Sequence, residues 1–395
     1  MADQAPGQVP VLGHVDERLR TTSLCLAVAY GARNDPAHRG GLAHLLEHLL
    51  MSAPVVGPTS LCEHVERLGG DANAETGLEL MLFTAQVHAS DAADVTRLLR
   101  GAVLEPRLDA AVLDRERAVV LQELAAAAAD PSDVVQDTFL ADVFGSHPLG
   151  RPVGGTAEEV GATSLDDVLD HHRDVFLTSP MALVVVGPDL PGATGLHRSP
   201  ARRSGRGGSV PISPPPRTRP APRWPDGFAW TCVGGRGPSA TDPDRLAYVL
   251  LSNLMGSSPA SLLYRRLRND GGLAYAFQSW SRAYTEAGAW RVLAGVDVGN
   301  GEALVEVITA TLEELASGGP SDEDLAAARR KAEMHLVRGS EVPAEYARLI
   351  AQRTLAGTVE WSVDQELAAL REVTGAQVVL AARRVLADLC VSVAS

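Results

Sequence analysis

The chain has 395 residues, of which 45% are hydrophobic and 21% charged, a globular composition long enough for two or three domains. Its net charge of −14 argues against nucleic-acid binding and against docking on an anionic membrane, because both depend on surplus Lys and Arg. The apolar runs are too short to span a membrane, and the polar first ten residues do not resemble a secretory signal. We therefore expect a cytoplasmic protein whose four scattered cysteines are reduced.

The first predicted elements are a strand with an Asp-Pro turn at residues 23–36 and a helix at residues 42–51. The helix carries His44, Glu47 and His48 among leucines. Residues four apart lie on one side of an α-helix, so the imidazoles of His44 and His48 can coordinate one metal ion. Glu47 points to nearly the same side of the helix. Zinc binds neutral imidazole, and a nearby carboxylate can take a proton from its water ligand. This HxxEH pattern, the inverzincin signature, predicts a catalytic zinc site.

Two later segments of the first half add candidate residues. A Gly-Gly pair at residues 69–70 precedes a predicted strand containing Asn73 and Ala74, which a plain turn before a strand would also explain. After a helix at residues 93–104, a charged helix at residues 109–128 contains Glu116 and Glu123. These two glutamates are seven residues apart, so they share one helical face. The zinc site needs a third ligand, and this helix offers two acidic candidates.

The segment 191–225 has the composition of a linker. It is rich in Pro, Gly and Ser and contains seven arginines and no acidic residue, so the rest of the chain carries a charge of about −21 (−14 minus +7). We expect a solvated tether here. The predicted domains are therefore residues 1–190, the linker 191–225, and residues 226–395.

The two halves are similar to one another. Residues 228–255 repeat the strand, turn and helix of residues 23–51 at an offset of 204, and each half continues with short strands, a long helix and a charged helix. Strands combined with helix pairs indicate an α+β unit in which a helix layer covers a sheet. At the positions of His44, Glu47 and His48 the second half has Tyr248, Leu251 and Ser252. We therefore expect two homologous α+β domains, of which only the first binds metal.

These motifs resemble the pitrilysin (inverzincin) family of zinc metallopeptidases. In that family HxxEH is followed some 75 residues later by the third metal ligand, and here Glu123 follows His48 by 75 residues. The resemblance implies that His44, His48 and Glu123 bind one Zn²⁺ per chain. It also implies that Glu47 is the general base and that Glu116 supports the metal ligands without binding the metal itself.

The resemblance also implies substrate contacts. Residues 68–76 are similar to the family strand whose edge pairs with the substrate backbone, which assigns Asn73 and Ala74 to peptide binding. Residues 262–277 resemble the segment in which an Arg and a Tyr seven residues apart lie over the scissile bond, which assigns Arg268 and Tyr275 to catalysis. Alternatively, Arg268 and Tyr275 only pack the second domain.

With two homologous units, this chain resembles the short members of the family, such as mitochondrial processing peptidase subunits and bacterial processing peptidases. Longer members carry four such units in one chain, which close around the substrate. The resemblance therefore implies a homodimer or a heterodimer with a homologous chain. Such a closed chamber would admit peptides or unfolded segments, and leader or precursor processing is one role. Two alternatives are a non-catalytic subunit of a heterodimeric peptidase and, more weakly supported, a metal-storage or sensing protein. The substrate's identity does not follow from the sequence.

Overall fold

The structure is a computed structural model that describes residues 9–190, 212 and 222–395, except residues 257, 271–272, 275, 298 and 358–360. The predicted linker therefore lies mostly outside the described residues. The chain divides into two compact units, each built from three segments. The first consists of Met1–Ala125, Pro152–Arg206 and Arg338–Ser362, and the second of Ala126–Arg151, Gly207–Val337 and Val363–Ser395.

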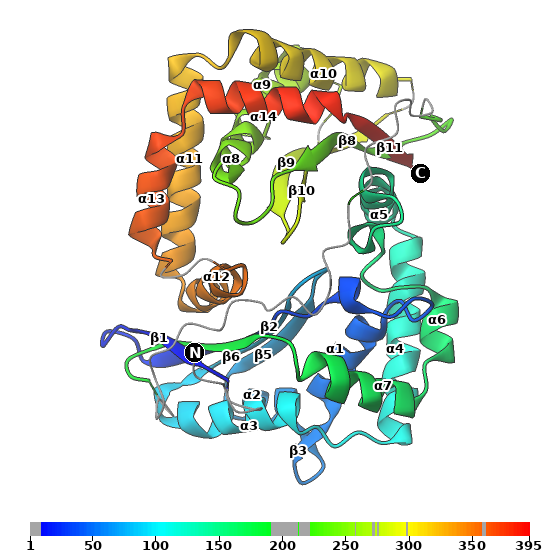
Figure 1. The fold of residues 1–395 in the computed structure, drawn as a ribbon, viewed down its shortest axis with the longest axis vertical. Coiled ribbons are helices and arrows are strands. Elements are labelled where there is room, and N and C mark those ends of the chain that lie inside the picture. The colour runs from blue at the N-terminus through cyan, green and yellow to red at the C-terminus, as the bar shows by residue number, and fades with distance from the viewer. Residues whose placement is uncertain are drawn as a thin grey trace. The chain divides into compact units, whose positions relative to one another are not determined.

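The first unit is built on a five-stranded sheet with the order β1-β7-β2-β6-β5 (Figure 1). Only the β1–β7 pair is parallel, and β5 is an edge strand. The central strands β2 and β7 are buried along almost their whole length, which is typical of strands covered on both faces. The strands are β1 (Val11–Val15), β2 (Thr21–Val28), β5 (Asp71–Thr76), β6 (Met81–His88) and β7 (Met181–Gly187), and β3 (Pro54–Val56) pairs separately with β4 (Thr59–Ser60).

Helices cover both faces of this sheet. Alternate residues of β2, such as Leu24 and Leu26, join a large core with α1 and α3, whereas Cys25 and Ala27 contact a smaller cluster with α12. That alternation follows from the two-residue period of a strand. The helices of this unit are α1 (Leu42–Ser52), α2 (Leu61–Arg67), α3 (Ala92–Leu104), α4 (Ala110–Ala128, ending in the second unit), α6 (Ala157–Ala162), α7 (Leu165–His171) and α12 (Pro343–Leu355).

The second unit is built on a four-stranded antiparallel sheet with the order β11-β8-β10-β9. Arg291 faces Phe139 of α5, whereas Gly235 on the neighbouring strand faces α14, so helices also cover both sides of this sheet. The strands are β8 (Ala229–Gly237), β9 (Phe277–Ala283), β10 (Gly288–Val296) and β11 (Cys390–Ala394). The helices are α5 (Pro131–Phe144), α8 (Arg245–Leu254), α9 (Leu262–Tyr264), α10 (Gly301–Gly318), α11 (Asp322–Glu341), α13 (Val363–Glu372) and α14 (Gly375–Ala387).

The two sheets share one topology, which confirms the α+β class and the duplication predicted from the sequence. The order β7-β2-β6-β5 of the first sheet is matched by β11-β8-β10-β9 in the second, and β1 is an addition to the first. The helix that follows the first shared strand is α1 in one copy and α8 in the other, at the predicted offset. Each copy then contains its own long charged helix, α4 or α11.

One helix from each half of the sequence packs on the sheet of the other half. Helix α5 follows α4 in the first half but contacts β8 and β11, and α12 follows α11 in the second half but contacts β2 and β7. In α12 the buried small residues Ala347 and Ala351 allow close approach to the first sheet. The domain limits predicted from the sequence do not include this exchange of α5 and α12.

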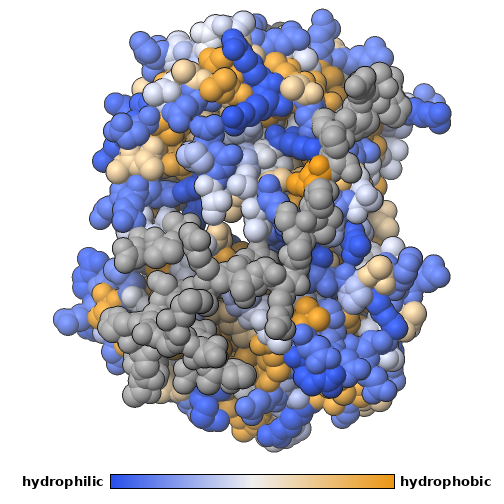
Figure 2. Space-filling view, viewed as in Figure 1, coloured by the Kyte–Doolittle hydropathy of each residue, from blue (hydrophilic) through white to orange (hydrophobic). Residues whose placement is uncertain are grey.

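On the face drawn in Figure 2, hydrophilic residues cover most of the visible surface, and hydrophobic residues appear in small patches. None of the described helices is both long enough and apolar enough to cross a membrane. All four cysteines are free thiols, and Cys25, Cys232 and Cys390 are buried.

Candidate metal centre

Helix α1 is fixed at its N-terminus by a buried carboxylate. Asp35 Oδ2 accepts a hydrogen bond from the backbone N–H of Gly41 (2.9 Å), and Oδ1 accepts one from Ala43 (2.9 Å). These amides belong to the first turn, which has no partners within the helix. Gly41 itself has a positive φ of 83°, a conformation that favours glycine. Asp35 therefore sets where helix α1 begins.

The three polar residues of α1 share its open side. From Leu42 to Leu50, every residue is buried except His44, Glu47 and His48, which are half-buried. The buried leucines belong to the large core of the first unit. The packing of the apolar side thus turns both imidazoles and the carboxylate away from the core, as the helical spacing predicts.

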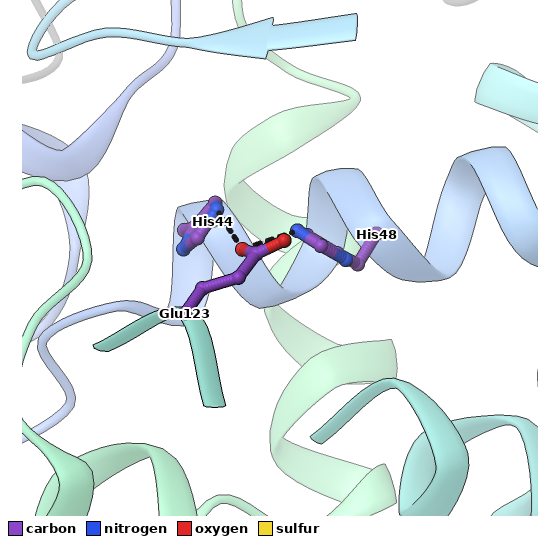
Figure 3. Close-up of side chains that lie close together, drawn as sticks. All are labelled: His44, His48 and Glu123. Carbon is purple, nitrogen blue, oxygen red and sulfur yellow. Dashed lines mark ion pairs between the residues drawn. The ribbon is translucent and has the colours of Figure 1, made fainter. Parts of the chain in front are cut away.

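His44, His48 and Glu123 converge on one point (Figure 3). Glu123 Oε2, from α4, lies 3.5 Å from His44 Nε2 and 3.2 Å from His48 Nε2. One ligand atom of each residue lies within 4.8 Å of the others, the single such group of three or more among the described His, Cys, Asp and Glu side chains. The structure therefore brings His44 and His48 together with Glu123, the glutamate that the family resemblance implied as the third ligand.

These separations suit a tetrahedral zinc ion. Two donors that are each about 2.05 Å from zinc and subtend a tetrahedral angle lie about 3.3 Å apart. Burial, followed by the neighbouring His48, lowers the pKa of His44 below its usual value, which favours the neutral imidazole that binds metal. His44 Nδ1 is buried and has no hydrogen-bond partner among the described residues. The donor set and its protonation thus fit zinc.

Glu47 stands beside this cluster and is not part of it. The Thr76 hydroxyl, at the end of β5, donates a hydrogen bond to Glu47 Oε2. Burial raises the pKa of Glu47 above its usual value, and the hydrogen bond from Thr76 opposes that rise. Glu47 is therefore a half-buried carboxylate next to the ligand group, held by a residue to which the sequence gave no separate role.

Glu116 lies on the opposite side of His48 from Glu123. Its Oε2 is 3.7 Å from His48 Nδ1, an electrostatic contact too long for a hydrogen bond, while Oε1 accepts a hydrogen bond from Arg115 Nε (3.1 Å). Glu116 is buried although it carries a carboxylate. This arrangement agrees with a supporting role, which stays a prediction.

The loop that contains Gly154 and Gly155 approaches helix α1 closely. A Cβ atom on Gly154 would lie 2.6 Å from Leu124 Cδ2 and 3.8 Å from His44 Nδ1, so only a glycine fits there without displacement. Gly155, with a φ of 68°, leaves no room for a side chain beside Gly40. The sequence alone assigned no role to this segment. Its glycines were the signal that the backbone approaches another segment.

The predicted peptide-binding residues lie on the edge strand of the first sheet. Asn73 and Ala74 belong to β5, which pairs with β6 and is the last strand in the order. Asn73 is exposed, and its carbonyl accepts a hydrogen bond from Thr84 Oγ1 (3.1 Å). Ala74 packs against the core on the other side of the strand. An edge strand has backbone groups available for one more strand.

The second copy has no comparable group of ligands among its described residues. Tyr248, Leu251 and Ser252 are all buried in α8, and the Ser252 hydroxyl donates to the Tyr248 carbonyl (2.8 Å). Asn253 Nδ2 donates to the carbonyl of Ala328 in α11 (3.2 Å), so the two helices pack as a structural pair.

Two predicted catalytic residues cannot be placed against this site. The backbone of Arg268 lies in a π-helical turn, Arg265–Asp270, but its side chain is outside the described part of the structure, as is Tyr275. Their roles stay predictions.

Two family models match the chain. The model described as "Insulinase (Peptidase family M16)" matches residues 11–157, and the model described as "Peptidase M16 inactive domain" matches residues 162–332. The first match contains His44, Glu47, His48 and Glu123, whereas the second begins after them.

Similar proteins cover most of the chain. An uncharacterized zinc protease of Mycobacterium leprae is 27% identical over 383 residues, which is 94% of this chain and 86% of that protein. The mitochondrial-processing peptidase subunit beta of Blastocladiella emersonii is 24% identical over 378 residues, 89% of this chain and 78% of that subunit. The crystal structure of a protease from Helicobacter pylori has a TM-score of 0.82 and 18% identity, and the match covers 97% of this chain and 96% of that one.

Proposed function

The chain belongs to peptidase family M16, the pitrilysin family that its motifs resemble, and we propose that it is a zinc-dependent endopeptidase acting on peptides or unfolded segments. The observation that supports this most is the convergence of His44 and His48 from α1 with Glu123 from α4. These three residues would hold one Zn²⁺ per chain.

Glu47 is the proposed general base. Zinc bound to this set would lower the pKa of a coordinated water molecule to near neutrality. Glu47 would then take a proton from the attacking water and give it to the leaving amine as the peptide bond breaks. Its half-buried position beside the proposed ligands supports this role.

The proposed substrate contacts are on β5. A peptide added beside Asn73 and Ala74 would form main-chain hydrogen bonds with the edge of the first sheet, and such bonds tolerate many side chains. The Asn73 side chain, being exposed, is available to a substrate carbonyl. In the proposed mechanism, Arg268 binds a substrate carbonyl and the Tyr275 hydroxyl stabilises the oxyanion.

A second chain is part of the proposal. The short members that the sequence resembles work in pairs, so we expect a homodimer, or a heterodimer with a homologous chain, that encloses a peptide chamber in the cytoplasm. Each zinc site would then be completed by the partner's Arg268 and Tyr275 equivalents. Processing of leader or precursor segments is the activity we would test first.

The decisive experiment compares Glu47→Gln with the wild type on a peptide library, with cleavage read by mass spectrometry. We expect the variant to bind zinc as the wild type does and to lose cleavage, because glutamine cannot accept the proton. Glu66→Gln, on α2 of the same unit, is the control and should keep full activity. Normal cleavage by Glu47→Gln would contradict the proposed mechanism.

A non-catalytic subunit is the second candidate. The observation in its favour is the match of residues 162–332 to a domain described as inactive. That match excludes the HxxEH helix and is therefore compatible with either function. Absence of cleavage by the zinc-loaded wild type, alone and with co-purified homologous chains, would favour this candidate.

A further inference from the structure

We propose that Thr76 is a positioning residue that fixes the carboxylate of Glu47 and links it to the peptide-binding strand. The inference deepens the proposed function and rests on it. Thr76 is the last residue of β5, and its hydroxyl donates a hydrogen bond to Glu47 Oε2. Nothing in the chemistry of the metal ligands requires this contact, since Thr76 is not part of the ligand group.

The direction of the Thr76 side chain follows from the strand. Side chains of β5 alternate between the two faces of the sheet, and Ala72 and Ala74 pack toward the core that includes α1. Thr76 has the same parity and therefore points toward α1 as well. Its β-branched side chain has few rotamers, so the hydroxyl is presented to Glu47 at little cost in conformational entropy.

The same end of β5 is anchored from the opposite face. Glu75 points away from α1 and forms an ion pair with Arg348 of α12, the helix that packs on the other side of the sheet. Arg348 also lies near Glu345 of its own helix (3.9 Å). Neighbouring residues, Glu75 and Thr76, thus attach the strand end to both helix layers of the first unit.

This geometry gives the two carboxylate oxygens of Glu47 different roles. A threonine hydroxyl has a single proton, and it is donated to Oε2. Oε1 accepts no hydrogen bond from Thr76, so more of its lone-pair capacity remains for a proton from water. Because Asn73 and Ala74 lie three and two residues before Thr76 on the same strand, a peptide that pairs with β5 would bind to the strand that orients the base.

The test compares Thr76→Val, which removes only the hydroxyl, with Thr76→Ser, which keeps it. Hydrogen bonds to charged groups affect equilibria by about 10- to 100-fold, so we expect kcat of Thr76→Val to fall by about that factor. KM and zinc content should stay within about twofold of the wild type. Thr76→Ser should recover most of the rate, and Thr96→Val, a buried hydroxyl on α3 bonded to the Ala92 carbonyl, should not change it.

A readout independent of activity separates this inference from the proposed function. In crystal structures we expect the Glu47 carboxylate in one orientation in the wild type and in Thr76→Ser, and in several in Thr76→Val. An unchanged kcat, equal losses in the Val and Ser variants, or one fixed Glu47 orientation in Thr76→Val would overturn the inference. If the wild type proved inactive, the proposed function would fail, while the orientation of Glu47 would still decide the role of Thr76.

Discussion

Glu116 and Glu123 lie on opposite sides of the His48 ring: Glu116 Oε2 is 3.7 Å from Nδ1, and Glu123 Oε2 is 3.2 Å from Nε2. The ring therefore has one carboxylate at each nitrogen. In the proposed site, where Nε2 binds zinc, the Glu116 carboxylate attracts the proton on Nδ1 and so favours the tautomer that binds metal. The seven-residue spacing on α4 produces this arrangement, because it places both glutamates on the face toward α1.

We predict that Glu116→Gln weakens zinc binding by about 10- to 100-fold, the usual effect of losing such a supporting carboxylate. Competition with a chromophoric chelator measures the affinity directly. Asp114→Asn is the control, because Asp114 is exposed on the same helix and pairs only with Arg117 in the described contacts. Equal zinc affinity in Glu116→Gln and the wild type would show that Glu116 does not support the site.

Zinc should stabilise the folded chain, because the ligands converge only in the native state. At a free zinc concentration of 100 times Kd the expected gain is about 2.7 kcal/mol. Thermal unfolding of chelator-treated protein, before and after zinc is added back, tests this. Glu123→Gln should lose most of the gain, whereas Glu47→Gln should keep it. A gain that survives in Glu123→Gln would assign the metal to other residues.

Much of this architecture is predictable from local patterns. The spacing of His44, Glu47 and His48 among leucines specifies one side of α1, and the repeat at an offset of 204 predicts two sheets of similar topology. Glu123 was assigned through a family resemblance, since the sequence alone left two glutamates as candidates. The structure then placed Glu123 beside both imidazoles.

The remaining features depend on contacts between distant segments, which no local pattern encodes. Asp35 belongs to a turn whose sequence reads only as Asp-Pro, yet its carboxylate caps α1. Nothing in the amphipathic pattern of α5 or α12 identifies which of two similar sheets each will cover. The contact of Thr76 with Glu47 spans 29 residues and arises because the edge strand runs beside α1.

We predict that Asp35→Ala destabilises the protein by about 2 kcal/mol. The substitution leaves the amides of Gly41 and Ala43 without their acceptor in a buried place, which costs more than the loss of an exposed cap. Urea denaturation measures the change in unfolding free energy. Asp130→Ala removes an exposed cap of α5, bonded to Ser132, and should cost about 1 kcal/mol. A smaller loss in Asp35→Ala than in Asp130→Ala would contradict this reasoning.

The pH dependence of stability should depend on His171. Burial lowers the pKa of His171 to about 4, with Asp174 opposing the shift, and its ring lies 5.5 Å from that of Tyr30. Its Nε2 is buried without a hydrogen-bond partner among the described residues. The unfolded chain, with a histidine pKa near 6.5, therefore takes up this proton more readily than the folded chain. Stability should fall as the pH drops from about 6.5 toward 4, by at most about 3 kcal/mol from this residue.

Urea denaturation of the wild type and His171→Phe at pH 7.5, 6.5, 5.5 and 4.5 isolates this contribution. Both proteins are kept zinc-free with a chelator, so that protonation of His44 and His48 affects them equally. Phenylalanine fills the same buried place beside Tyr30 and does not titrate, so the variant should lose less stability between pH 6.5 and 4.5. Parallel stability curves for the two proteins would mean that His171 stays as basic in the folded chain as in the unfolded one, and that its burial does not set the acid sensitivity of the first unit.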